Sequence, residues 1–227
     1  MKRWFITGTD TEIGKTSVTA IIAAGLRASQ CDVLAVKPLM SGAEPHEPGA
    51  DSVIIATSAG HTPRVHTWWK TPVSPHRAAW IEDKPLDTEH LRQWIQYQRA
   101  DYVLVEGVGG WKVPLAMTST GEVQYCVEDM ARDVDGSILL VAPNRLGVLN
   151  HIQLTIAAIE GCGLTVQGVI LNQTQSEPES VAEKTNLEDI RLLLAIPVTT
   201  CPFISEFKSE QIGSVGQRIC RELSLIE

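Results

Sequence analysis

The stretch Gly8-Thr9-Asp10-Thr11-Glu12-Ile13-Gly14-Lys15-Thr16 decides the fold. It lies between a short apolar run and a longer segment with the periodicity of a helix. Glycine lets the backbone come close to a polyphosphate, and the N–H groups that open a helix surround the phosphate oxygens. A lysine such as Lys15 neutralises phosphate charge, and the hydroxyl group of Thr16 is a suitable ligand for Mg²⁺. The sequence therefore predicts a phosphate-binding loop between a first strand and a first helix.

The spacing of the two glycines departs from the most common pattern for such a loop. Five residues separate Gly8 from Gly14, one more than in Gly-x-x-x-x-Gly-Lys-[Ser/Thr], and the first loop position is Thr9. A glycine-containing turn that binds nothing is the alternative interpretation. The place of the motif, directly after the first strand, favours phosphate binding.

Short apolar runs alternate with helical segments along the rest of the chain. The predicted strands are Arg3–Thr7, Asp32–Val36, Tyr102–Val105, Ser137–Val141 and Thr165–Leu171. The predicted helices are Lys15–Ser29, Asp51–Ala59, Thr88–Arg99, Val127–Asp133, Val148–Glu160, Ser180–Leu194 and Ser209–Leu223. This alternation predicts an α/β fold with a mainly parallel sheet flanked by helices. No linker separates two regions that could each complete a sheet, so we expect one domain over residues 1–227.

Three other features indicate local structure. The runs Val113–Met117 and Val123–Val127 flank a turn-like segment and predict a hairpin or an irregular excursion. The Pro-rich stretches Gly42–Gly49 and Thr62–Pro75 are expected to be surface loops. Asp87 is expected to cap the helix that follows it.

An apolar strand that ends in a carboxylate, Val103–Gly110, gives the second functional signal. At the carboxyl edge of a parallel sheet, Glu106 would share a rim with the phosphate loop and hold Mg²⁺ directly or through water. A solvated glutamate at a strand end is the alternative for this segment alone. The presence of Lys15 and Thr16 favours the metal site.

Two further residues are expected on or near this rim. Lys37 follows the second predicted strand, where it would supply positive charge at a transferring phosphoryl group, although a lysine there can simply face solvent. Asp51 opens a predicted helix after a flexible loop, and a role as its N-cap would account for this aspartate without any function.

Composition excludes several function classes. The 227 residues hold 19 Lys+Arg against 27 Asp+Glu, a formal charge of -8, so nucleic acid is not expected as a partner. The apolar stripe of the last predicted helix has no strongly basic opposite face, so we expect it to dock on the sheet rather than on a membrane.

The cysteine pattern and the N-terminal residues suit a cytoplasmic protein, and the histidine pattern bears on metal binding. Five scattered cysteines without a Cys-x-x-Cys pair predict reduced, mostly buried thiols. Only three apolar residues follow the basic pair at the N-terminus, too few for a signal peptide, and no run reaches the length of a membrane span. The six histidines show no metal-ligand spacing, so no zinc site is expected.

Taken together, several segments resemble the dethiobiotin synthetase family. They are the phosphate loop, Lys37-Pro38 with Ser41-Gly42, Ser74-Pro75-His76, Val105–Trp111 and Leu146–His151. The resemblance runs in order from residue 1 to about residue 172 and thins beyond Asn172. It implies the fold of phosphate-loop NTPases.

The resemblance also implies an activity. The family closes the ureido ring of dethiobiotin in biotin biosynthesis from 7,8-diaminononanoate and CO₂, with ATP as co-substrate and Mg²⁺ as cofactor. One amine takes up CO₂ as a carbamate, ATP phosphorylates the carbamate oxygen, and the second amine attacks the mixed carbamic-phosphoric anhydride to release phosphate. Positioning and charge stabilisation suffice for such a phosphoryl transfer.

The resemblance assigns roles to residues of this chain. Lys37 matches the catalytic lysine, and Lys15 supplies further charge at the transferred phosphate. The implied metal ligands are Thr16, Asp51 and Glu106, and the implied nucleotide contacts are Glu12, Ile13, Gly14, Lys15, Thr16, Ser17, Asp51, Glu106, Gly107, Val108, Gly109 and Asn172. The implied substrate contacts are Thr11, Lys37, Ser41 and, from the partner subunit of a homodimer, residues matching Gly147, Val148, Leu149 and Asn150. A homodimer with shared active sites is therefore expected.

The match is weakest around the nucleotide base. Asn172 matches an asparagine that contacts adenine, but the family's Glu-Ile-Pro segment is Ala195-Ile196-Pro197 here. The resemblance therefore covers the base-binding segment only in part.

Two other classes of phosphate-loop protein differ from this chain in their sequence features. A MinD/ParA-type ATPase switch normally has a second lysine early in its loop, where this chain has Asp10. An amide-forming ligase related to cobyrinic acid synthases usually has a glutamine-hydrolysing domain, for which 227 residues leave no room.

Overall fold

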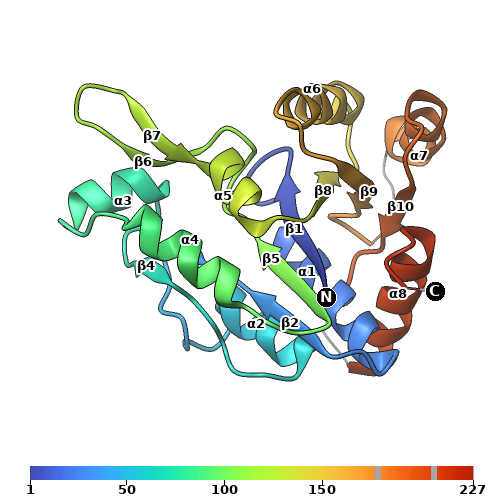
Figure 1. Ribbon diagram of the computed structural model, residues 1–227. Coiled ribbons are helices and arrows are strands. Elements are labelled where there is room, and N and C mark those ends of the chain that lie inside the picture. The colour runs from blue at the N-terminus through green and yellow to red at the C-terminus, as the bar shows by residue number, and fades with distance from the viewer. Residues whose placement is uncertain (177–179, 206–208, 227) are drawn as a thin grey trace.

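A parallel sheet forms the centre of the molecule in the computed structural model, which describes residues 1–176, 180–205 and 209–226. In these residues the main sheet has six strands in the order β10-β9-β8-β1-β5-β2, all parallel (Figure 1). The bounds of its strands are β1 Lys2–Gly8, β2 Val33–Val36, β5 Tyr102–Glu106, β8 Ser137–Pro143, β9 Val166–Asn172 and β10 Val198–Cys201. The helices are α1 Lys15–Ala28, α2 Asp51–Ala59, α3 Pro75–Ile81, α4 Thr88–Tyr97, α5 Val127–Val134, α6 Val148–Gly161, α7 Val181–Leu193 and α8 Ser209–Glu222. The predicted α/β fold is confirmed.

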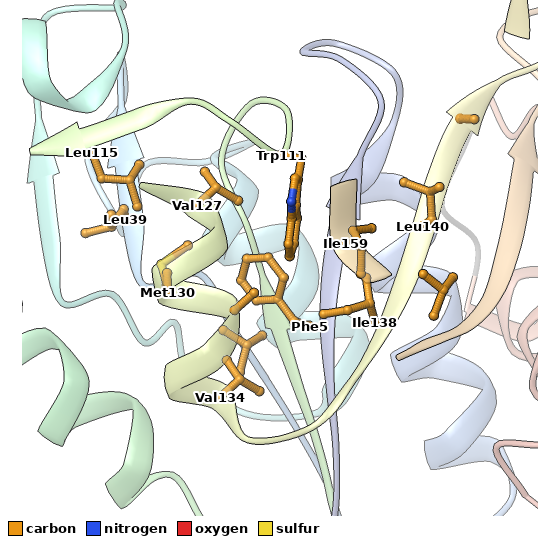
Figure 2. Close-up of a cluster of buried hydrophobic side chains, with 14 of the residues drawn as sticks. Phe5, Leu39, Trp111, Leu115, Val127, Met130, Val134, Ile138, Leu140 and Ile159 are labelled. Carbon is orange, nitrogen blue, oxygen red and sulfur yellow. The ribbon is translucent and has the colours of Figure 1, made fainter. Parts of the chain in front are cut away.

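Side chains of each strand alternate between two apolar layers. Trp4 and Ile6 of β1 pack with the layer that holds α1, α2 and α8, whereas Phe5 packs with the layer that holds α4, α5, α6 and α7. Figure 2 shows Phe5 in this second cluster with Met130 and Val134 of α5. The sheet is thus covered on both faces, which explains why its strands are nearly continuous apolar runs.

The order of the strands places the functional edge. β1 lies between β5 and β8, and the chain moves to one side of β1 for β2 and to the other side for β9 and β10. Ligands of open parallel sheets bind at the carboxyl ends of strands beside such a change of direction. The phosphate loop, Glu106 at the end of β5 and Asn172 at the end of β9 all lie at these ends.

Two small sheets flank the main one. β3 (Leu39–Ser41) pairs in parallel with β4 (Thr67–Trp69), and β6 (Pro114–Met117) pairs antiparallel with β7 (Val123–Cys126). The second pair confirms the predicted hairpin, which projects with α3 to one side of the molecule (Figure 1).

Other local expectations were partly wrong. The stretch expected as a surface loop from Thr62 contains β4, and Trp69 of that strand is fully buried. The strands β3, β4 and β10 were missed, because a run of three or four residues has few positions to show an alternating pattern. Asp87 does cap α4, because its carboxylate accepts a hydrogen bond from the His90 backbone at 2.9 Å.

The described residues also bear on the membrane and cysteine expectations. No helix within them is long and apolar enough to cross a membrane. All five cysteines are free thiols; Cys201 and Cys220 are buried, but the other three are only half-buried.

Candidate functional site

A polar cavity of about 610 Å³ opens at the carboxyl edge of the sheet, beside the end of β1. Its lining brings together residues that are far apart in the sequence: Thr11, Glu12, Gly14, Lys15, Thr16, Lys37, Ser41, Asp51, Glu106, Val108 and Gly109. The phosphate loop, the end of β2, the start of α2 and the turn after β5 therefore form one site, as expected from their position after parallel strands.

Two positions of the phosphate loop require glycine, because neither has room for a side chain. Gly14 is the N-cap of α1 at φ 88°, and a Cβ there would lie 2.1 Å from Nδ2 of Asn172. A Cβ on Gly8 would lie 2.5 Å from the side chain of Ile13. The Asn172 amide donates to the Ile13 carbonyl at 2.9 Å, so the end of β9 holds the loop from behind. The open N-terminus of α1 consequently faces the cavity with its N–H groups, which suits an anion.

Lys15 lies folded across this loop and is 7% exposed. Its Nζ donates to the Asp10 carbonyl at 2.7 Å. Burial, together with the nearby charge of Lys37, lowers the pKa of Lys15 to about 8, although Glu106 and Asp10 act in the opposite direction. An anion placed in the loop would stabilise the charged lysine and raise this pKa.

A buried ion cluster forms the floor of the cavity. Lys37 Nζ lies 2.5 Å from Glu106 Oε1 and 3.0 Å from Asp51 Oδ2, and the Thr16 hydroxyl donates to the same Glu106 oxygen at 2.8 Å. Lys37 and Glu106 are almost fully buried, while the side chain of Asp51 is 46% exposed. The cluster gives Lys37 a fixed position against the phosphate loop rather than a free surface location.

The pKa shifts in the cluster follow from burial and from these contacts. Burial by itself would lower the pKa of Lys37, but the contacts with Glu106 and Asp51 raise it above the usual lysine value. Burial and the Asp51 charge raise the pKa of Glu106, and Lys37 opposes this rise. Burial would likewise raise the pKa of Asp51, but Lys37 brings it below its usual value. Lys37 therefore keeps its proton and its positive charge.

The oxygen atoms of this cluster suit a hard divalent cation. Oε2 of Glu106 is buried and has no hydrogen-bond partner, and a hydroxyl and a second carboxylate, from Thr16 and Asp51, lie in the same cavity. Such oxygen donors fit Mg²⁺, which prefers one or two carboxylates together with water and phosphate. Among the described residues no group of three His, Cys, Asp or Glu side chains could hold a metal, so the set depends on the threonine.

Asp51 is not the N-cap that its sequence position suggested as an alternative. The N-cap of α2 is Ala50, with extended backbone angles, and Asp51 is the first helical residue. Its carboxylate is held by Lys37 and so faces the cavity.

Other predicted residues occupy different places. Ser17 and Asn172 line a second, smaller depression of about 230 Å³, whose lining also includes Glu12, Gly14, Pro202, Phe203 and Ile204. Gly147, Val148, Leu149 and Asn150 open α6 and do not line the cavity of their own chain. Ile13 and Gly107 are buried behind the cavity, and a Cβ on Gly107 would lie 2.8 Å from Phe5.

Sequence reasoning missed several lining residues. Met40, Ala43, Gly49, Ala50 and Pro72 also line the cavity, and Pro202, Phe203 and Ile204 close the second depression. They have no chemistry of their own that a motif could reveal. Their position depends on the pairing of β3 with β4 and on β10, which the sequence pattern did not predict.

Comparison with known proteins identifies the family. A family model described as an AAA domain matches residues 2–201. A protein of Bacillus velezensis named ATP-dependent dethiobiotin synthetase BioD is 33% identical over 219 residues, which cover 93% of this chain and 91% of the relative. A protein of the same name from Aromatoleum aromaticum is 35% identical over 206 residues, covering 87% and 88%. The chain belongs to the ATP-dependent dethiobiotin synthetase family.

Membership of the dethiobiotin synthetase family confirms the resemblance seen in the sequence and makes this chain an enzyme of the ligase class. Among solved structures, a plasmid partition protein from Borrelia burgdorferi has a TM-score of 0.53 at 12% identity, covering 97% of this chain and 98% of that one. A DUF1611 family protein from Anabaena variabilis has a TM-score of 0.54 at 13% identity, covering 99% and 57%. At these identities the likeness concerns the fold alone, and it confirms the phosphate-loop NTPase fold without favouring a switch over a synthetase.

Proposed function

We propose that this enzyme closes the ureido ring of dethiobiotin from 7,8-diaminononanoate, CO₂ and ATP, releasing ADP and phosphate. The observation that carries the proposal is the single cavity in which Lys15, Thr16, Lys37, Asp51 and Glu106 meet. Two lysines and a set of oxygen ligands at a phosphate loop are what transfer of a phosphoryl group to a weak nucleophile requires. The names of the similar proteins supply the substrate class.

The proposed reaction has three steps. One amine of the substrate attacks CO₂ and loses a proton, which gives a carbamate. A carbamate oxygen then attacks the γ-phosphorus of ATP, and the bond to the β-phosphate oxygen breaks as ADP leaves. The second amine attacks the carbonyl carbon of the mixed anhydride and loses a proton, and the C–O bond to phosphate breaks as the ring closes.

Lys37 is the residue best placed to serve these steps. Its ammonium group is buried, charged and held between Glu106 and Asp51 beside the phosphate loop. In this position it would stabilise negative charge on the carbamate and on the phosphoryl group in flight, while Lys15 would hold the phosphate chain on the α1 side. The two carboxylates orient the Lys37 ammonium group and keep its proton.

The oxygen ligands and the second depression complete the proposed nucleotide site. Thr16, Asp51 and Glu106 would hold Mg²⁺, which supplies charge neutralisation to the phosphates when bound. The phosphates would lie against Glu12, Gly14, Lys15, Thr16 and Ser17, with Val108 and Gly109 across the cavity. The base would enter the depression between Asn172 and the Pro202–Ile204 segment, whose ring and aliphatic groups suit a flat heterocycle.

The diamine would be held between two subunits. Thr11 and Ser41 line the cavity on the substrate side, whereas Gly147, Val148, Leu149 and Asn150 lie elsewhere in the same chain. The first N–H groups of a helix attract a carboxylate, so α6 of the partner subunit would bind the carboxylate of the substrate in a homodimer. We further propose that the enzyme works in the cytoplasm, with no nucleic acid or membrane partner.

The test measures the products formed with and without the diamine. Purified enzyme with ATP, Mg²⁺ and bicarbonate is assayed for phosphate release and, by mass spectrometry, for dethiobiotin, in the presence and absence of 7,8-diaminononanoate. We expect phosphate and dethiobiotin to form in equal amounts and only with the diamine. ATP hydrolysis that is indifferent to the diamine would refute the proposal in favour of a switch.

A further inference from the structure

Three buried asparagines connect α7 to the functional edge of the sheet. Asn144 follows β8, Asn172 ends β9 and Asn186 lies in the middle of α7; they are 2%, 7% and 4% exposed. A buried amide is costly unless its hydrogen bonds are made, so these side chains have little freedom to reorient.

Asn186 is the link from the helix. Its Nδ2 donates to Asn144 Oδ1 at 2.8 Å and to the Arg145 carbonyl at 3.2 Å. Asn144 in turn donates from its own Nδ2 to the Glu183 carbonyl at 2.8 Å. The segment that leaves β8 is therefore fastened to α7 at two successive residues.

The Arg145 carbonyl has a second role, because it closes the turn that starts α6. The Val148 N–H donates to it at 3.2 Å, and Gly147, between them, has φ 91° and ψ −6°. These angles are those of the third residue of a type II turn, a position that favours glycine. The amide of Asn186 thus holds the acceptor that sets the direction of the α6 N-terminus.

The phosphate loop does not depend on Asn186 in the same way. Asn172 holds the loop through its own side chain, and its carbonyl accepts from the Asn144 backbone N–H at 2.9 Å. Loss of the Asn186 amide would free the Arg145 turn and leave both of these bonds intact. The two halves of the proposed site are consequently separable by mutation.

We propose that Asn186 is a positioning residue for substrate binding: it acts through Asn144 and the Arg145–Val148 turn to aim the N-terminus of α6 at the substrate carboxylate in the partner subunit. This inference rests on the proposed function. Asn186 touches no reacting atom, and its effect is confined to the affinity for the diamine.

The kinetic test replaces Asn186 by leucine, whose side chain has the same number of heavy atoms, branches at the same carbon and has no hydrogen-bond donor. We expect Asn186→Leu to raise KM for 7,8-diaminononanoate about tenfold, while KM for ATP and kcat stay within about twofold of the wild-type values. The matched control is Ile190→Ala, one turn further along α7, which removes buried apolar contacts and no hydrogen bond, since an isoleucine side chain makes none to Asn144 or Arg145. It should lower thermal stability and leave KM for the diamine unchanged.

A second measurement tests the stability of the Arg145–Val148 turn and does not depend on catalysis. Amide hydrogen exchange at Val148 and His151, whose N–H groups donate to Arg145 and Gly147, should be faster by about tenfold in Asn186→Leu and in Asn186→Ser, with Gly14–Thr16 unchanged. An unchanged KM together with unchanged exchange, or an equal rise of KM in Ile190→Ala, would overturn the inference. A wild-type enzyme without diamine-dependent turnover would instead overturn the proposed function, and the exchange result would still decide whether Asn186 holds the turn.

Discussion

Lys15 and Lys37 are both buried at the rim of the sheet, but their surroundings shift their pKa values in opposite directions. Burial lowers the pKa of Lys15 to about 8, whereas Glu106 and Asp51 raise the pKa of Lys37 despite its burial. Of these two lysines, only Lys15 is therefore partly uncharged slightly above neutral pH. Binding of an anion in the loop should change how much of Lys15 is protonated, and this change can be measured.

The first prediction concerns this proton. Between about pH 8 and 10.5 the free enzyme holds Lys15 partly deprotonated, and bound phosphates favour the charged form, so binding raises its pKa. At pH 9, Mg²⁺ with a non-hydrolysable ATP analogue should bind with uptake of up to about one proton per site, seen by calorimetry in buffers of different ionisation enthalpy. Lys15→Arg, which stays charged, should bind without this uptake. Equal uptake in this variant would assign the proton to another group.

The second prediction separates the two acidic residues. If both hold Mg²⁺, Asp51→Asn and Glu106→Gln should each raise the Mg²⁺ concentration for half-maximal activity, by about tenfold or more. Only Glu106→Gln should also lower the thermal stability of the metal-free enzyme, because Glu106 is buried against Lys37 while Asp51 is half-exposed. A normal Mg²⁺ requirement in either variant would remove that residue from the metal site.

For individual residues, the sequence predicted which side chains lie at the carboxyl edge of the sheet, because each of them follows a strand or opens a helix there. It did not predict that Lys37 lies between Asp51 and Glu106. That contact depends on β2 pairing with β5, two strands whose paired residues Val36 and Val105 are 69 positions apart in the sequence but adjacent in the sheet. The sequence by itself is equally compatible with a Lys37 side chain that faces solvent.

At the scale of elements, the closest packing is between α1 and α8. A Cβ on Gly25 of α1 would lie 2.2 Å from the backbone of Gly216, and one on Gly216 would lie 2.0 Å from the Ile21 carbonyl. The two helix backbones are therefore in direct contact where they cross. α1 carries the phosphate loop at its start, so this crossing also fixes the direction of the loop.

The third prediction tests the contact between α1 and α8 by comparing two glycines that both lie in helices. Gly25→Ala should destabilise the protein by at least about 3 kcal/mol, because neither backbone can yield without separating the helices. Gly161→Ala, in the last turn of α6 with no atom near the added Cβ, should be neutral or stabilise it by up to about 1 kcal/mol. Urea denaturation of both variants measures the difference. Similar free energies of unfolding would show that the helices do not cross as closely as described.

Long elements could be predicted from the sequence, whereas of the short ones only β2 and the β6–β7 hairpin were predicted. The helices α1, α2 and α6 and the strands β1, β5 and β8 have enough periodic positions to show their faces. β3, β4 and β10 have three or four residues each, and their identity depends on partners elsewhere in the chain. The second depression, closed by the segment after β10, was missed for this reason.

At the scale of the whole molecule, the proposed site is incomplete in one chain. The cavity holds the phosphate loop and the ion cluster, whereas the turn that opens α6 lies outside it. Asp10 of the loop and Arg145 of the turn approach to 3.7 Å, but both side chains are about half exposed, so this pair contributes little. Under the proposed function, the carboxylate of the substrate would bind α6 of a second subunit.

The last prediction is that two inactive chains restore activity in a mixed dimer. Lys15→Ala removes charge from the phosphate loop, and Gly147→Pro destroys the turn before α6, because proline cannot adopt the φ of 91° found there. In a dimer of one chain of each kind, one of the two composite sites combines an intact loop with an intact α6, which gives about half of the wild-type activity. Co-expression with two affinity tags isolates the mixed dimers, after each parent has been shown to fold and dimerise. Because the two lesions meet in the other site, that site stays inactive, and activity above about half would show that one lesion is incomplete. Mixed dimers as inactive as their parents would mean that each chain holds the carboxylate by itself, which would also remove the reason for Asn186 to act across the subunit boundary.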